Sequence, residues 1–216
     1  MKLGSSVHIG IAVVALAAMT SCTAGTQLTS SWAEPTAAGH TYQKIVVVGA
    51  TERAPVRHRY EDAFVTALQQ RGVTSVASYS VAGDGRLDKD AAAAKLQEIG
   101  ADAVIVTRLV DKESYQEYYP PTYSTVAAPS AYYGGWYGYY SLGYSYQSSP
   151  GYTVQNNVFR IETNLYDVKN GKLLWSGITE TTVAAGESAH GEIEPTIYLL
   201  LGDMEKHGVL PKPVKK

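Results

Sequence analysis

Two apolar runs rich in valine constrain the fold more than any other feature of this sequence. They are KIVVVGA at residues 44–50 and ADAVIVTRLV at residues 101–110. Apolar runs that do not alternate with polar residues are typical of strands covered on both faces, and such strands are mostly parallel. A shorter run lies near residues 73–80, and the segments between the three runs have helical periodicity. The order βαβαβ predicts an α/β domain whose central strands are parallel.

Turn and cap residues bound the two helices expected between these strands. The first helix is expected to have Pro55 in its first turn and to reach Gln70, with Gly72 ending it. Its apolar face consists of residues spaced four apart: Tyr60, Phe64 and Leu68. The second helix is expected to begin after the N-cap Asp88 and to end at Gly100. Its apolar face consists of Ala92, Leu96 and Ile99.

The C-terminal part predicts a hairpin and a last helix. Residues 159–165 alternate apolar and polar side chains, which is typical of a half-buried strand. Asn170-Gly171 is a strong signal for a tight turn and leads into a strand over about residues 173–184. Apolar residues then recur at helical spacing: Ile193, Ile197, Leu200, Leu201 and Met204. Pro195 fits only in the first turn of that helix, and Gly208 is suited to cap it.

The expected fold is therefore a single mixed-sheet α/β domain over residues 43–210, with a tail at 211–216. Its element order is βαβαβ, then a β-hairpin and a C-terminal α-helix. A Tyr- and Gly-rich insertion at residues 114–153 interrupts this order. The insertion holds 12 of the 17 Tyr, four Pro and one charged residue, Glu117. It shows neither helical nor strand periodicity, so we expect a low-complexity loop.

Three interpretations of the insertion stay open. The simplest is a mobile loop without a function of its own. In the second, flat amphipathic rings stack on sugars or fill the pockets of a partner protein. The candidate binding residues are Tyr132, Tyr133, Trp136, Tyr137, Tyr139 and Tyr140. The third is a membrane-inserting hairpin, against which the prolines argue because each lacks a backbone donor.

The N-terminus resembles a bacterial lipoprotein signal. Lys2 is followed by an apolar stretch from Val7 to Met19, which is too short to span a bilayer comfortably. Small residues then precede the single cysteine, Cys22, although Met19 stands where the lipobox prefers Leu. The resemblance implies that residues 1–21 are a signal peptide and that Cys22 receives a diacylglycerol and an N-acyl chain. Two or more chains give stable membrane anchoring.

Two alternatives to lipidation remain, a secreted protein with an incidental Cys and an uncleaved helical anchor. Residues 22–42 are rich in Ser, Thr, Ala and Gly, and we expect a flexible tether after the lipidated N-terminus. Thr23 follows the cysteine in place of the Asp that resembles an inner-membrane retention signal. This favours the outer membrane, with the domain facing the periplasm.

No catalytic or cofactor motif is recognisable in the sequence. Nucleophile-elbow, phosphate-loop and H-E-x-x-H patterns are absent, and a single Cys excludes an internal disulfide framework. The net charge of −2 gives no polycation signature for nucleic acid. We expect neither enzymatic activity nor a cofactor beyond the lipid on Cys22.

Two weaker clusters have both a functional and a plain interpretation. The nearest approach to a metal pattern is Glu187, His190, Glu192 and Glu194. A single imidazole among carboxylates is poor for zinc, and a charged loop opening the last helix explains the pattern equally. The second cluster is basic: Arg53, Arg57, His58 and Arg59. It could bind an acidic partner or lipid phosphates, but Glu61 and Asp62 beside it favour a solvated helix start.

The chain as a whole resembles a group of small bacterial envelope lipoproteins. The likeness covers about residues 43–210 and includes GADAVIV and the D-x-x-x-G-K-L-x-W hairpin from Asp167 to Trp175. It is to the domains of CsgG, LpoB and the TolB N-terminal region. The resemblance implies a non-catalytic role through protein contacts in assembly, secretion or cell-wall synthesis, with oligomers possible. The alternative is a cell-wall glycan-binding module that uses the Tyr-rich loop.

Overall fold

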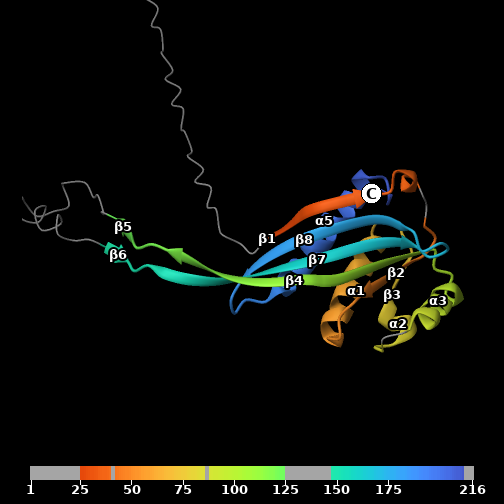
Figure 1. The fold of residues 1–216 in the computed structure, drawn as a ribbon, viewed down its shortest axis with the longest axis horizontal. Helices are drawn as coiled ribbons and strands as arrows, with labels where there is room; N and C mark the ends of the chain where they lie inside the picture. The colour runs from red at the N-terminus through yellow and green to blue at the C-terminus, as the bar shows by residue number, and fades with distance from the viewer. Residues whose placement is uncertain (1–24, 40–41, 86–87, 125–146, 212–216) are drawn as a thin grey trace, which may run out of the picture.

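The computed structural model describes residues 25–39, 42–85, 88–124 and 147–211. Its body is a six-stranded mixed sheet with helices packed against it (Figure 1). The strands are β1 (Gly25–Ala33), β2 (Ile45–Gly49), β3 (Ser75–Ala77), β4 (Ala103–Tyr119), β7 (Tyr152–Asp167) and β8 (Leu173–Ala184). The helices are α1 (Ala54–Gln69), α2 (Ser78–Ala82), α3 (Lys89–Glu98) and α5 (Ile193–Lys206). The strand order is β1-β8-β7-β4-β2-β3, which confirms the predicted mixed-sheet α/β class.

The first half of the domain confirms the βαβαβ order. β2 pairs in parallel with both β3 and β4, and four of its five residues are buried. α1 has Pro55 in its first turn and buries its predicted apolar face against the sheet. Gly72, with φ of 76°, provides the left-handed conformation that ends the helix. Asp88 caps α3, because its Oδ1 accepts a hydrogen bond from the Ala91 amide at 2.8 Å.

The second predicted strand is shorter than expected. β3 covers only Ser75–Ala77, and the chain then turns into α2 instead of continuing to residue 80. The buried carboxylate of Glu61 explains this turn. It accepts hydrogen bonds from the Ser78 hydroxyl at 2.7 Å and from the Tyr79 amide at 3.1 Å. These two bonds hold the first turn of α2 against α1.

The C-terminal hairpin and helix follow the predicted pattern. β7 and β8 are antiparallel and are joined at Asn170-Gly171, where Gly171 has φ of 68°. α5 buries Ile197, Leu200, Leu201 and Met204, with Ile193 partly buried at its start. The indole of Trp175 on β8 donates a 3.0 Å hydrogen bond to Asp203 of α5, which ties the helix to the sheet.

The predicted flexible tether is wrong for residues 25–39. Residues Gly25–Ala33 form β1, the edge strand that pairs antiparallel with β8. A short 3₁₀ helix, η1 (Pro35–Ala37), follows, and the Ala37 side chain is buried in the core. The physical reason is that an edge strand rich in Thr and Ser needs few apolar residues. Leu28 alone provides a packing contact near the middle of the strand, and the Thr26 hydroxyl lies 2.8 Å from that of Thr181.

The insertion also begins later and ends earlier than predicted. β4 continues to Tyr119 and β7 starts at Tyr152, and the two strands pair throughout this length. A second small antiparallel pair, β5 (Thr122–Ser124) and β6 (Gln147–Ser149), follows. Most side chains in this ribbon are exposed, because the two strands are held by pairing with each other and not by packing against the core. The alternation of apolar and polar residues that predicts a half-buried strand is therefore missing. We call residues 116–124 and 147–155 the arm.

Several predicted sites lie outside the described residues. These are Cys22 with the signal peptide and the candidate binding residues Tyr132, Tyr133, Trp136, Tyr137, Tyr139 and Tyr140. In the part of the chain that the structure describes, no helix has the length and apolar character needed to cross a bilayer.

Candidate functional site

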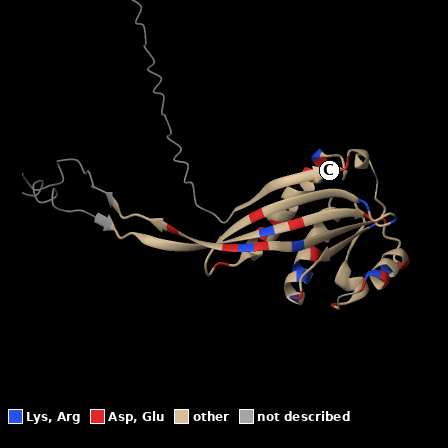
Figure 2. Ribbon diagram, in the orientation of Figure 1, with Lys and Arg blue, Asp and Glu red and all other residues tan. Residues whose placement is uncertain are grey.

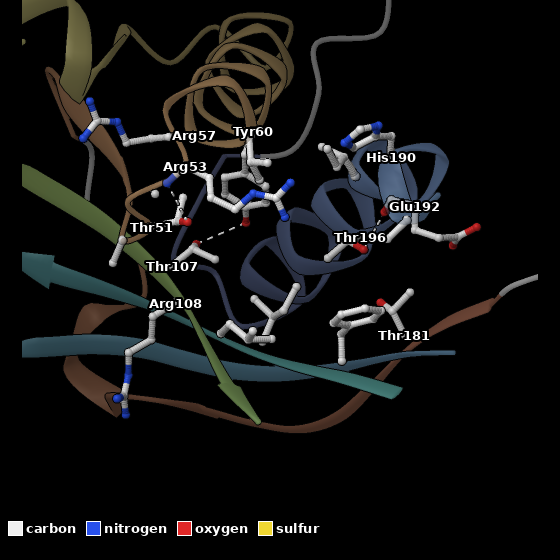
Figure 3. Close-up of a pocket in the computed structure, with 18 of the residues that line it drawn as sticks. Thr51, Arg53, Arg57, Tyr60, Thr107, Arg108, Thr181, His190, Glu192 and Thr196 are labelled. Atoms are coloured by element: carbon white, nitrogen blue, oxygen red, sulfur yellow. Dashed lines mark hydrogen bonds between the residues drawn. The ribbon is translucent and has the colours of Figure 1, made fainter. Parts of the chain in front are cut away.

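A cavity of about 510 Å³ opens between the sheet and the first turns of α1 and α5. The C-terminal ends of these two helices are held together, because the Arg71 guanidinium at the end of α1 pairs with Glu205 of α5. Near their N-termini, the cavity separates the two helices above the sheet (Figure 3). The connection to α5 through the 3₁₀ helix η3 (Ala189–Glu192) forms one rim of the cavity.

The floor of the cavity is largely apolar. It consists of inward-facing residues of three neighbouring strands, Leu109 on β4, Phe159 and Ile161 on β7, and Thr181 on β8. Leu109 is 53% exposed, and it lies two residues beyond Thr107, the last residue of β4 that pairs with β2. Leucine is usually among the buried residues, so this part of the sheet is open to solvent.

A chain of three hydroxyl groups lies at the inner end of the cavity. Tyr60 Oη is 3.1 Å from Thr107 Oγ1, which is 2.9 Å from Thr163 Oγ1. Burial raises the pKa of Tyr60 to about 12, so its phenol stays protonated at physiological pH. The two bonds use two of the three hydroxyl protons. The third proton can be donated to a ligand acceptor in the cavity when it lies on Tyr60 or Thr107, which line the cavity, whereas Thr163 does not.

The structure divides the predicted basic cluster into separate roles. Arg57 is nearly buried, and its guanidinium donates to the carbonyl of Asp84 at 3.1 Å and to that of Gly83 at 3.3 Å. It also pairs with the Asp84 carboxylate, as does His58 at 2.6 Å. His58 and Arg57 together lower the pKa of Asp84. These two side chains therefore hold the loop after α2 and are not available to an acidic partner.

Arg53 has a different environment. It precedes α1, lines the cavity and is exposed, and among the described residues it forms no ion pair. Figure 3 shows its side chain extending across the cavity toward α5, whereas Arg57 and Arg108 point away. Arg59 lies on α1 but does not line the cavity. Arg53 is thus the member of the cluster that faces the cavity.

The predicted metal pattern is not brought together in the part of the chain described. No three His, Cys, Asp or Glu side chains come within coordinating range of one another there. His190 and Glu192 lie on the cavity rim, but Glu192 accepts a 3.2 Å hydrogen bond from the Thr26 hydroxyl of β1. Figure 3 shows the Glu192 carboxylate directed away from the cavity.

The arm is the second candidate surface, and it differs from the body in charge. Figure 2 shows that the charged residues are concentrated on the body. The arm carries only Glu117, which accepts a 3.2 Å hydrogen bond from Asn156. Tyr118 and Tyr152 are 63% and 57% exposed, and the Tyr119 and Tyr152 rings stack with centroids 5.1 Å apart. Tyr118 and Tyr119 are consecutive in a strand, so the arm presents aromatic rings on both faces.

The face of the sheet opposite the cavity is polar and internally paired. Arg160 on β7 donates to Asp111 and Glu113 of β4 and to Glu180 of β8, at 2.6, 3.1 and 3.0 Å. Arg108 pairs with Glu162 in the same way at 2.9 Å. Cross-strand pairs of this kind satisfy one another, so the charged groups named here are already paired.

Sequence reasoning did not identify the cavity. Its residues come from several elements distant in the sequence, and none of them forms a motif. The available signals were Arg53 in the basic cluster, His190 and Glu192 in the suspected metal pattern, and the alternating run at Phe159 and Ile161. That alternation predicted a buried face, and the structure shows that part of this face lines an open cavity.

Comparison with known proteins gives only distant similarities to solved structures. No protein-family model matches the sequence, and no curated protein matches it. Among solved structures, the PelC dodecamer from Paraburkholderia phytofirmans is similar at 14% identity with a TM-score of 0.44, covering 88% of this chain and 100% of that one. Lipoprotein GNA1162 from Neisseria meningitidis is similar at 14% identity with a TM-score of 0.40, covering 76% of this chain and 99% of that one. At this level of similarity, neither protein assigns an activity or a partner to this chain.

Proposed function

We propose that this protein is a lipid-anchored bacterial envelope lipoprotein, without catalytic activity, that binds a protein partner through its arm. The observation that carries the proposal is the arm itself. The pairing of β7 with β8 ends at Asn156 and Ala184. From there toward Tyr152, β7 pairs only with β4, and the arm is a two-stranded ribbon. Such a ribbon is marginally stable alone, and a partner that covers it would stabilise it.

The chemistry of the arm suits a protein interface. Exposed tyrosine rings provide large, rigid contact areas with a hydroxyl that can hydrogen-bond, and Tyr is enriched at protein interfaces. The arm has one charged residue, so little charge must be desolvated when it is covered. Each strand of the arm pairs with the other strand along one edge, and a partner strand can add to the other edge beyond Gln155, whose carbonyl accepts from the Ala185 amide.

The anchor rests on the sequence before β1. Cys22 follows the apolar stretch and stands three residues before Gly25, the first residue of β1. Lipidation at Cys22 would hold the domain at an envelope membrane, and Thr23 after the cysteine favours the outer one. The Cys22→Ser variant should then appear as an uncleaved or mislocalised precursor. Recovery of this variant as a mature, lipid-labelled membrane protein would exclude the anchor.

The partner proposal is tested with arm variants in the anchored protein. We expect the Tyr118→Ala, Tyr152→Ala double variant to lose crosslinked partners that the unchanged protein retains in isolated envelopes. Tyr198→Ala, which removes an exposed tyrosine of α5, is the matched control and should retain them. Equal crosslinking by the unchanged protein and the double variant would contradict a role for the arm.

A cell-wall glycan is the alternative ligand, and the exposed flat rings of Tyr118 and Tyr152 favour it. Binding to purified peptidoglycan separates the two candidates, because no protein is present in that assay. Saturable binding that the double variant loses would replace the protein partner with the glycan.

A further inference from the structure

We propose that the cavity between α1, α5 and the sheet binds a small amphipathic molecule that carries a carboxylate on an aliphatic body. This inference is independent of the arm and of the lipid anchor. The cavity volume of about 510 Å³ falls within the range of small-molecule sites, which is roughly 300–1,000 Å³. Its lining separates into an apolar region and a polar region, and this separation indicates the ligand class.

The apolar region would take the aliphatic body. Leu109, Phe159 and Ile161 form a continuous patch, since Leu109 pairs with Ile161 across the strands and Phe159 lies two residues away on the same face. Val56 of α1 and Ile193 of α5 provide the side walls. Covering Leu109, which is 53% exposed, would remove apolar surface from water that the fold leaves uncovered.

The polar region would take the carboxylate. Arg53 faces it without an ion pair among the described residues, and an arginine fork matches the two oxygens of a carboxylate. Tyr60 and Thr107 offer a hydroxyl proton at the inner end. α1 has no acidic residue in its first turn and no side-chain cap, so its positive end is uncompensated.

The other charged groups around the cavity do not reverse this preference. Arg57 and Arg108 are committed to Asp84 and Glu162, and Figure 3 shows both side chains pointing away. His190 lies on the rim and adds positive charge when protonated. Glu192 is the one acidic residue of the lining, and it is directed away and accepts from Thr26. The charge that faces the cavity is therefore positive, which favours an anionic group over a neutral or cationic one.

Calorimetric titration with three ligands of equal chain length tests the proposal. The protein is the mature chain from residue 22 with Cys22→Ser, which retains every described element and needs no detergent. The ligands are octanoate, octan-1-ol and octylammonium. We expect saturable binding of octanoate, and binding of the other two that is weaker by about tenfold or more, since a hydrogen bond to a charged group contributes about 1.5–3 kcal/mol.

Two variants and one control locate the site. Arg53→Gln should weaken octanoate binding by about tenfold and leave octan-1-ol binding unchanged. Ala189→Trp places a large ring in the cavity from its rim and should abolish binding of both. The control is Arg59→Gln, which removes an exposed arginine of α1 that does not line the cavity. This variant should bind octanoate normally. All three positions are outside the buried core, and far-UV circular dichroism checks that each variant is folded.

Each other outcome overturns the proposal. Equal affinity for octanoate and octan-1-ol, unaffected by Arg53→Gln, would exclude the carboxylate site. Octanoate binding that survives Ala189→Trp in a folded variant would place the ligand elsewhere. The absence of saturable octanoate binding to the unchanged protein would exclude this ligand class.

Discussion

Glu61 shows how one side chain determines the local path of the backbone. It has no exposed surface and accepts three hydrogen bonds, from the Gly49 amide at 2.8 Å, the Ser78 hydroxyl and the Tyr79 amide. A buried carboxylate is tolerated only when its oxygens are satisfied in this way. Glu61 thereby joins the end of β2, the middle of α1 and the start of α2, and it sets the position of one wall of the cavity.

We expect Glu61→Ala to lower the free energy of unfolding by about 3 kcal/mol, because it leaves one buried and two partly buried donors without an acceptor. Urea unfolding followed by circular dichroism measures the change. Glu52→Gln alters an exposed carboxylate nearby and should be neutral within about 0.5 kcal/mol. A small effect of Glu61→Ala would mean that water replaces the carboxylate.

Tyr60 is expected to make the free energy of unfolding fall as the pH rises above 10. Burial raises its pKa from 10.0 to about 12, so the folded state favours the protonated phenol. The resulting stabilisation is complete below pH 10 and is lost as the pH rises toward 12. A shift of this size corresponds to about 3 kcal/mol. Tyr60→Phe should show a smaller loss of stability between pH 10 and 12, measured by urea unfolding at each pH. An unchanged loss would assign the alkaline transition to other groups.

At the level of helices and strands, the sequence predicted the elements that pack against the core. β2, β4, β7, β8, α1 and α5 all lie against the core, and their apolar spacing follows from that contact. β1 and the arm were missed because their strands are held by backbone pairing and hydroxyl contacts and bury little apolar surface. The cavity was missed for a related reason. Apolar residues predict a covered face, but their spacing does not indicate whether a helix reaches far enough to cover it.

Two glycines should respond to alanine in opposite directions. At Gly177 on β8, a Cβ would lie 2.2 Å from the ring of Trp175, which is fully buried and cannot move away. Gly177→Ala should therefore destabilise the domain by about 1–3 kcal/mol. Gly202 lies in α5 with open space around it, so Gly202→Ala should stabilise by about 0.5–1 kcal/mol. Thermal unfolding measures the change in stability of each variant. A change of the same sign in both would contradict the packing around Trp175.

The packing of α5 gives a further prediction. Leu200 is fully buried between the helix and the sheet. Leu200→Ala should destabilise the domain by about 2–5 kcal/mol, because it removes apolar contacts and leaves a cavity. Urea unfolding measures the loss, with the exposed Glu194→Ala of the same helix as control. An unchanged midpoint would show that α5 does not contribute to the core.

At the scale of the whole molecule, β1 begins at the end of the sheet from which the arm extends. Gly25 begins β1 opposite Thr182, and Ala184, two residues further along β8, is opposite Asn156 at the base of the arm. Two residues separate Cys22 from Gly25, so the chain between them spans at most about 10 Å. If Cys22 is lipidated as proposed, the domain is held close to the membrane surface with the base of the arm near it. A long flexible tether would not impose this arrangement.

The last prediction separates the arm from the fold. Glu117 and Val154 are direct cross-strand partners, so replacing residues 118–153 with Asn-Gly closes the two strands with a tight turn and removes both Tyr118 and Tyr152. The described residues of the removed part contribute nothing to the buried core, and a shorter connection lowers the entropic cost of loop closure. We therefore expect an unfolding free energy within about 1 kcal/mol of the unchanged protein, together with retained octanoate binding. Partner capture from crosslinked envelopes should be lost. An unfolded variant would show that the arm belongs to the folding unit, whereas a folded variant that still captures its partner would place the interface on the body of the domain.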